Sequence, residues 1–178
     1  FTRCGSITVA LTDERKEEIF RQAAMARAFG VEVEEITPEE VKSKYKHLNI
    51  NGVTGGVWLP LDGQGDPTNI ALALAKGARQ MGAQVIENTK VVTVQRAGRR
   101  VTSVKWKNEQ GENGTIECEN IINCGGMWGH EIGRMLGINV PLHACEHFYI
   151  VTEPIDGLTQ MPVLRVPDEC AYYKEDAG

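Results

Sequence analysis

The sequence lacks three features that would narrow its class at once: closely paired cysteines, an excess of basic residues and a long hydrophobic run. Its net charge is -5, and phosphate binding needs a basic face, so we expect no nucleic-acid partner. No run of roughly eighteen apolar residues occurs, so we expect no membrane span.

Cysteine usage argues against a zinc site and against a redox dithiol, because no two cysteines form a C-x-x-C pair. We therefore expect free thiols in a reducing compartment. His143 and His147 stand at a spacing that can bind a metal on a helix, but the residues around them favour a strand. We expect no metal site. The five cysteines are Cys4, Cys118, Cys124, Cys145 and Cys170.

Both ends of the sequence look internal to a longer chain. The first residues, FTRCGS, are neither an initiator methionine nor a signal peptide. The last residues, KEDAG, follow a predicted strand directly, with no helix or tail behind them. We therefore expect this sequence to be an internal fragment.

The composition, 42% hydrophobic and 24% charged, is ordinary for a globular domain, and the length suffices for a sizeable core. Helices are predicted from Asp13 to Gly30, Thr37 to Tyr45, Asp66 to Arg79 and after Gly126. Strands are predicted at 7–11, 31–36, 56–60, 83–95, 101–107, 115–118, 119–125, 141–154 and 171–174, with the rest of 155–178 loop-like. These patterns predict a mixed α/β (α+β) fold with largely antiparallel strands, built from parts of two interleaved domains.

The most unusual stretch is Asn123-Cys124-Gly125-Gly126, which ends a predicted strand and precedes Met127, Trp128 and a helix. Glycines at a strand end let a ligand approach the backbone, and a helix start offers free N–H groups to an anion. One interpretation is a cradle for the phosphates or ring of a cofactor. The other is a tight turn into a helix that Trp128 packs.

The sequence does not contain the glycine-rich turn that a dinucleotide-binding site normally has. Such a site normally has a G-x-G-x-x-G turn between a strand and a helix. Gly63-Gln64-Gly65 does not fit this pattern, because it precedes Asp66-Pro67 and not a strand-to-helix turn of the required spacing.

Four side chains can move protons or hold an amine: His147, Tyr149, Tyr172 and Tyr173. In a strand, His143, Cys145 and His147 would share one face. A histidine on a pocket wall can accept a proton or orient a charged substrate. The alternatives are a strand histidine satisfied by a neighbour and tyrosines that only pack.

Three long blocks of the sequence resemble the flavin-dependent dimethylglycine and sarcosine dehydrogenases, within the D-amino-acid-oxidase-like FAD oxidoreductases. The blocks are GGVWLPLDGQGDPTNIALALAKGARQMGAQVIENTKVVTV at 55–94, ECENIINCGGMWGHEIGRMLGINVPLHACEHFYIVTEPI at 117–155 and PVLRVPDECAYYKE at 162–175. The resemblance covers only the middle of the flavoprotein half of such proteins. It implies a D-amino-acid-oxidase-like FAD/NAD(P)-binding fold.

The resemblance assigns roles to individual residues. It implies that Cys124, Gly125, Gly126 and Trp128 lie beside FAD and that the backbone at Val91 meets the adenine. It further implies that two side chains line the substrate cavity over the flavin, position the amine and help to remove its proton. These side chains are His147 and Tyr172.

The resemblance also implies an enzyme that oxidatively demethylates N-methylated glycines, with the hydride passing to FAD. Electrons would pass on to an acceptor such as electron-transfer flavoprotein or oxygen, and a C-terminal half outside this sequence could bind tetrahydrofolate. The implied location is the mitochondrial matrix for a eukaryotic protein and the cytoplasm for a bacterial one. Residues 1–82 and 141–178 would belong to the substrate-binding sheet, and residues 83–140 to the FAD-binding domain.

Two other functions stay open at this point. The segment LHACEHFY at 142–149 is very similar to one in the regulatory subunit of pyruvate dehydrogenase phosphatase, a non-catalytic relative. An enzyme of the same broad family that acts on another amine also fits the residues.

Overall fold

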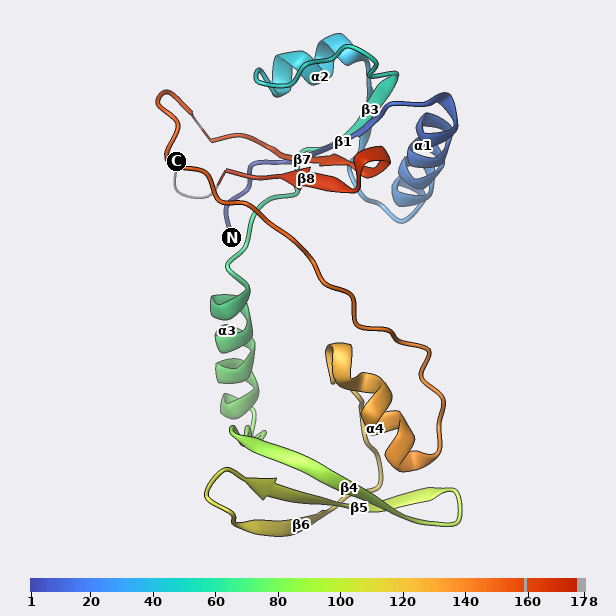
Figure 1. Ribbon diagram of the computed structural model, residues 1–178, viewed down its shortest axis with the longest axis vertical. Helices are drawn as coiled ribbons and strands as arrows, with labels where there is room; N and C mark the ends of the chain where they lie inside the picture. The colour runs from blue at the N-terminus through green and yellow to red at the C-terminus, as the bar shows by residue number, and fades with distance from the viewer. Residues whose placement is uncertain (159, 176–178) are drawn as a thin grey trace. The chain divides into compact units, whose positions relative to one another are not determined.

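The computed structural model describes residues 1–158 and 160–175 (Figure 1). Its chain contacts define two compact units, which are described one at a time below. One unit joins the two ends of the sequence, Phe1–Leu74 with Val151–Gly178, and the other is the middle, Ala75–Ile150. The chain therefore leaves the first unit once and returns to it, as interleaved domains require.

The first unit is built on a five-stranded sheet in the order β2-β3-β1-β7-β8. The pairing of β1 with β7 is parallel, and the other three pairings are antiparallel. The strands are β1 (Ser6–Ala10), β2 (Glu34–Ile36), β3 (Gly55–Leu59), β7 (Val163–Val166) and β8 (Ala171–Tyr173). Strand β7 thus brings the end of the sequence beside its beginning (Figure 1).

Two helices of this unit begin at capping residues visible in the sequence. Helix α1 (Asp13–Ala28) starts at Thr12, whose side chain accepts a hydrogen bond from the N–H of Arg15. Helix α2 (Pro38–Lys44) starts at Thr37 with a complete capping box. Both starts were predicted, because the side chains that satisfy the first N–H groups are local.

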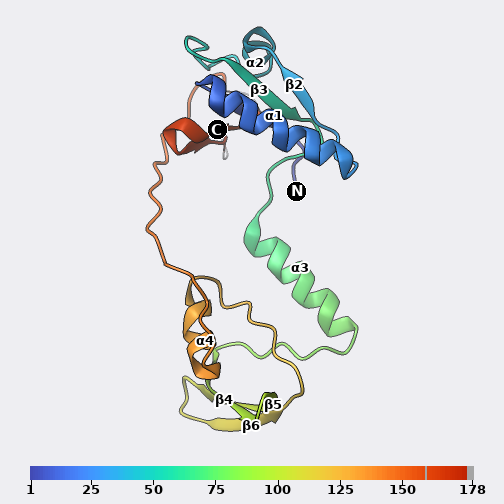
Figure 2. The same cartoon turned by 90° about the vertical axis from the view of Figure 1, so that its right-hand side faces the viewer.

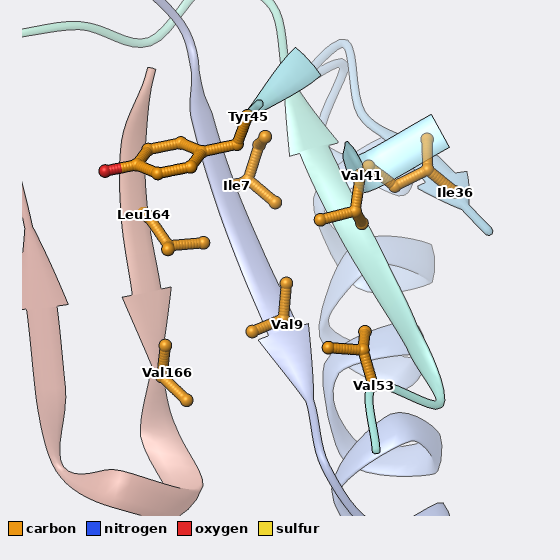
Figure 3. Close-up of a cluster of buried hydrophobic side chains, with 8 residues drawn as sticks. All are labelled: Ile7, Val9, Ile36, Val41, Tyr45, Val53, Leu164 and Val166. Carbon is orange, nitrogen blue, oxygen red and sulfur yellow. The ribbon is translucent and has the colours of Figure 1, made fainter. Parts of the chain in front are cut away.

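Hydrophobic side chains fill both faces of this sheet. Figure 3 shows one cluster, in which Ile7, Val9, Leu164 and Val166 from adjacent strands meet Val41 and Tyr45 at α2. On the opposite face α1 lies across β3 and β2 (Figure 2). The buried residues there are Ala10, Ile19, Ala23, Val33 and Val57. The sheet is therefore a core layer whose central strand is β1, with β3 and β7 on either side.

Replacing Leu164 with alanine should lower the free energy of unfolding by about 2–5 kcal/mol, because the buried leucine would leave a cavity. Leu164 is 2% exposed. Leu61, in the same unit, is 52% exposed, and its replacement by alanine should change stability by no more than about 0.5 kcal/mol. Denaturant unfolding of both variants measures the difference. Equal effects would contradict the assigned core.

The middle unit contains an antiparallel three-stranded sheet and a short helix. The strand order is β4-β5-β6, and the β4–β5 turn has Gly98 with a φ of +62°. Its elements are β4 (Thr89–Ala97), β5 (Arg100–Asn108), β6 (Asn113–Glu117), the 3-10 turn η1 (Gly126–Trp128) and α4 (Gly129–Leu136). Helix α3 (Pro67–Gln80) spans the boundary between the two units.

The predicted strands at 119–125 and 141–154 are wrong for this structure, which assigns no strand to either range. Alternation of apolar and polar residues indicates a strand, but a strand also needs a neighbour to pair with. None of the described strands pairs with these ranges. Without such pairing, the shared face predicted for His143, Cys145 and His147 has no support.

Strand β7 was missed by the sequence analysis, which treated residues 155–170 as loop. It has only four residues and lies between Pro162 and Pro167. Prolines commonly bound loops, so the local signal favoured one. The interior position of β7 comes from its parallel pairing with β1, far away in sequence.

The contacts place the unit boundaries at 74/75 and 150/151, whereas the sequence analysis placed them at 82/83 and 140/141. His147 therefore lies in the same unit as the turn at 123–128. The assignment of substrate binding to the outer segments and of flavin binding to the middle stays a prediction. No helix in the described part of the chain has both the length and the apolar character to cross a membrane.

Candidate flavin-binding turn and substrate residues

The turn that begins at Asn123 is held by one amide side chain. Its Oδ1 accepts from the N–H of Gly125 at 3.1 Å, and its Nδ2 donates to the carbonyl of Gly129 at 2.9 Å. The same side chain thus joins Gly125 at the start of the turn to Gly129 at the start of α4. This arrangement fixes the backbone path into α4.

Gly125 and Gly126 differ in what a larger side chain would meet at each position. A Cβ on Gly125 would lie 2.8 Å from the terminal methyl of Ile132, so a larger residue would have to displace that methyl. Gly126 has a φ of +52°, which favours glycine, and a Cβ there would meet no atom within 4 Å. The backbone at Gly126 is therefore bare and open.

The residues that follow present a flat apolar surface beside this open backbone. Met127 is 53% exposed and Trp128 is 60% exposed, although both are large and hydrophobic. Helix α4 follows η1 directly, and the N–H of Gly129 already donates to the carbonyl of Gly126. An accessible glycine beside an exposed indole fits the approach of a flat group to the backbone.

Val91, the residue predicted to meet the adenine, lies in β4 opposite Trp106. The pairing of β4 with β5 is irregular between Val91 and Thr93, which marks a bulge. Strand β4 meets α4 further along, where Arg96 Nη1 donates to the carbonyl of Leu136 at 2.9 Å. The unit therefore joins the strand of Val91 to the helix that follows the glycine turn.

His147 lies in a stretch of the middle unit that has no regular structure. It is exposed and makes no hydrogen bond or ion pair with any described residue. The next three residues, Phe148, Tyr149 and Ile150, are 89%, 84% and 92% exposed. The structure thus leaves the imidazole free to act on a ligand. Within the described ranges, no three His, Cys, Asp or Glu side chains gather as a metal site would need.

Tyr172 and Tyr173 point to opposite faces of the first unit's sheet, because adjacent residues of a strand alternate. Tyr172 pairs with Arg165 and is 65% exposed, whereas Tyr173 pairs with Leu164 on the face of the core cluster. Burial, and then the nearby Tyr173, raise the pKa of Tyr45 on that face. The two tyrosines therefore have different surroundings, and Tyr172 is the more accessible.

The structure assigns His147 and Tyr172 to different units. Cys124, Gly125, Gly126 and Trp128 lie close together in one turn of the middle unit. That His147 and Tyr172 meet over a flavin stays a prediction.

Sequence reasoning missed Asp168, which lies in the short 3-10 turn η2 (Pro167–Glu169) between β7 and β8. Its carboxylate accepts from the N–H of Leu11 at 2.9 Å and from Arg15 Nε at 3.1 Å. The hydrogen bond from Leu11, and then Arg15, lower the pKa of Asp168 although partial burial opposes them. No local pattern signals this contact, because Arg15 lies 153 residues away in sequence.

Replacing Asp168 with asparagine should destabilise the protein at neutral pH and have little effect in acid. A lowered pKa in the folded state stabilises the fold above the ordinary value of 3.8, and this stabilisation disappears as the pH falls through the lowered pKa. Denaturant unfolding at about pH 7 and about pH 2.5 measures the two differences. A difference that grows toward acid would contradict the assigned contacts.

His130, in the first turn of α4, was also not singled out by the sequence. Its Nδ1 is buried and has no hydrogen-bond partner among the described residues. His130 and Arg134 line an open cavity of about 430 Å³ beside the loop 137–142. The helix that follows the glycine turn therefore carries an unsatisfied polar group.

Comparison with known proteins identifies the family of the chain. The family profile described as "FAD dependent oxidoreductase", abbreviated DAO, matches residues 1–177. The chain belongs to this family of FAD-dependent oxidoreductases. The crystal structure of L-proline dehydrogenase from P. horikoshii has a TM-score of 0.77 at 26% identity, over 99% of this chain and 46% of that one. The predicted fold class is thereby confirmed.

Curated relatives confirm the resemblance. Human sarcosine dehydrogenase is 35% identical over 175 residues, which is 96% of this chain and 18% of that protein. Human dimethylglycine dehydrogenase is 32% identical over 180 residues, 99% of this chain and 20% of that protein. The mouse pyruvate dehydrogenase phosphatase regulatory subunit is 35% identical over 170 residues, 94% of this chain and 19% of that protein. The chain spans about a fifth of the length of these relatives.

Proposed function

We propose that this chain is part of a flavoprotein that oxidatively demethylates N-methylated amino acids such as dimethylglycine or sarcosine. The observation that carries the proposal is the likeness to two dehydrogenases named for those substrates, which extends over nearly the whole chain. The open turn at Gly126 and Trp128 supports it, since a flavoprotein needs a surface for the cofactor.

The proposal gives each site residue a physical task. The turn from Cys124 to Gly126 presents its backbone to the cofactor, Trp128 contributes a flat apolar surface, and Val91 meets the adenine through its backbone. His147 accepts or holds the proton of the amine, as an exposed imidazole with a free nitrogen can. Tyr172 orients the amine through its hydroxyl.

The bound FAD would supply the redox chemistry by accepting a hydride from the N-methyl carbon. The substrate loses a hydride and becomes an iminium ion, and water then releases formaldehyde and the demethylated amine. Electron-transfer flavoprotein or oxygen would remove the two electrons. His147 and Tyr172 contribute geometry and proton control to this sequence.

A substrate panel tests the proposal. The full-length protein that contains these residues is supplied with FAD and an artificial electron acceptor, and dimethylglycine, sarcosine, L-proline and a D-amino acid are compared. We expect the highest kcat/KM and formaldehyde release with one of the N-methylglycines. A preference for L-proline or the D-amino acid would refute the proposed substrate class. The assignment to the family of FAD-dependent oxidoreductases would still hold.

A non-catalytic regulatory role is the second candidate. It is favoured by the segment at 142–149 and by 35% identity to a phosphatase regulatory subunit, as high as that to sarcosine dehydrogenase. Under this candidate the protein would bind FAD, but no amine would reduce the bound flavin. Substitution of His147 would then leave regulation of the partner unchanged.

The proposal extends to features outside this chain. A tetrahydrofolate-binding half would capture the one-carbon unit that demethylation releases, so formaldehyde yield should fall when tetrahydrofolate is added. The location would be the mitochondrial matrix for a eukaryotic protein and the cytoplasm for a bacterial one, which fractionation can test.

A further inference from the structure

The carboxylate of Asp168 attaches the turn between β7 and β8 to residues near the start of the sequence. Asp168 accepts hydrogen bonds from the N–H of Leu11, just after β1, and from Arg15 in the first turn of α1. Arg15 is held in turn by Glu18. The Asp168 side chain is 17% exposed, so these contacts are largely screened from water.

Strand β8 depends on this turn for its position. It has only three residues and lies at the edge of the sheet, where β7 is its one partner among the described strands. A strand this short contributes little pairing of its own. The residue before it, Cys170, has a φ of +53°, which a side chain rarely adopts without support from its surroundings. Tyr172, the middle residue of β8, therefore takes its place from the turn.

We propose that Asp168 is a positioning residue for Tyr172, because it ties the turn before β8 to β1 and α1. This inference rests on the proposed function, in which the hydroxyl of Tyr172 orients the amine. Asp168 itself does not touch the substrate in this account. Its effect on turnover passes through Tyr172 and through no other residue of the site.

A double-mutant cycle separates positioning from plain stability. In the flavin-loaded full-length protein, D168N should lower kcat/KM by roughly tenfold to 10²-fold, as a displaced orienting group does. In the background of Tyr172→Phe, the same change should have almost no further effect on kcat/KM. A merely structural aspartate would lower kcat/KM by the same factor in both backgrounds, and that result would overturn the proposal.

The matched control is Glu169→Gln, which removes the neighbouring acid. Glu169 is exposed and makes no hydrogen bond or ion pair with any described residue, so this change should leave kcat/KM unaltered. If D168N fails to fold, Arg15→Gln replaces it, because that change keeps the bond from Leu11 and removes one partner of Asp168. An equal loss in E169Q and D168N would overturn the proposal.

Hydrogen exchange provides a readout that does not need turnover. In D168N, the amides of residues 171–173 should exchange at least tenfold faster than in the parent, with no change in β4 or β5. Unchanged exchange at 171–173 would overturn the inference. If the parent oxidises no N-methyl amine but D168N still loosens β8, the proposed function fails while the positioning of β8 by Asp168 stands.

Discussion

Replacing His147 with alanine should lower kcat by roughly 10²- to 10⁴-fold, the usual contribution of a positioned proton acceptor. His147 is exposed and has no partner among the described residues, so no internal contact competes for its nitrogens. For the same reason its removal should cost the fold little, and flavin should stay bound. Steady-state kinetics with dimethylglycine and the flavin absorbance of the purified variant measure both quantities.

The matched control for this prediction is His143→Ala. His143 lies in the same exposed, irregular stretch and differs from His147 in having no proposed contact with the amine. We expect near-normal turnover from it. Equal losses in the two variants would mean that the segment, and not the imidazole, matters.

Replacing Gly126 with valine should abolish most flavin binding. A β-branched side chain there would project into the space that is now empty, and overpacking costs about 1–3 kcal/mol. That range corresponds to roughly tenfold to 10²-fold weaker flavin binding. Flavin titration followed by fluorescence measures the dissociation constant directly.

Gly98→Val controls for backbone strain in the Gly126 experiment. Both glycines have a φ in the left-handed region, +62° at Gly98 and +52° at Gly126, and neither has an atom within 4 Å of the added Cβ. The two substitutions should therefore destabilise the middle unit alike. Only the Gly126 variant should lose flavin. If both variants bind flavin as tightly as the parent, the turn at 123–128 is not the flavin surface.

The elements that sequence predicted well are those whose causes are local. The caps at Thr12 and Thr37 satisfy N–H groups three residues away, so a short window contains the whole argument. Strand β7 and the irregular stretch at 141–155 show the limit. The first is a strand because β1 lies beside it, and the second alternates like a strand but has none of the described strands beside it.

The candidate site likewise combines features with local causes and contacts between residues that are far apart in sequence. The open backbone at Gly126 and the exposed Trp128 fit the cradle, one of the two interpretations that the sequence left open for this turn. The role of Asp168 could not be predicted, since its partners Leu11 and Arg15 lie at the other end of the sequence. The opposite directions of Tyr172 and Tyr173 follow from strand alternation once β8 is placed.

Anaerobic reduction of the bound flavin is the most direct test of the central claim. The full-length protein is loaded with FAD, freed of oxygen and mixed with dimethylglycine or sarcosine, and the flavin absorbance is followed through a single turnover. The account predicts complete bleaching with release of one formaldehyde per flavin. A protein that holds FAD yet keeps it fully oxidised with every N-methyl amino acid would contradict the account.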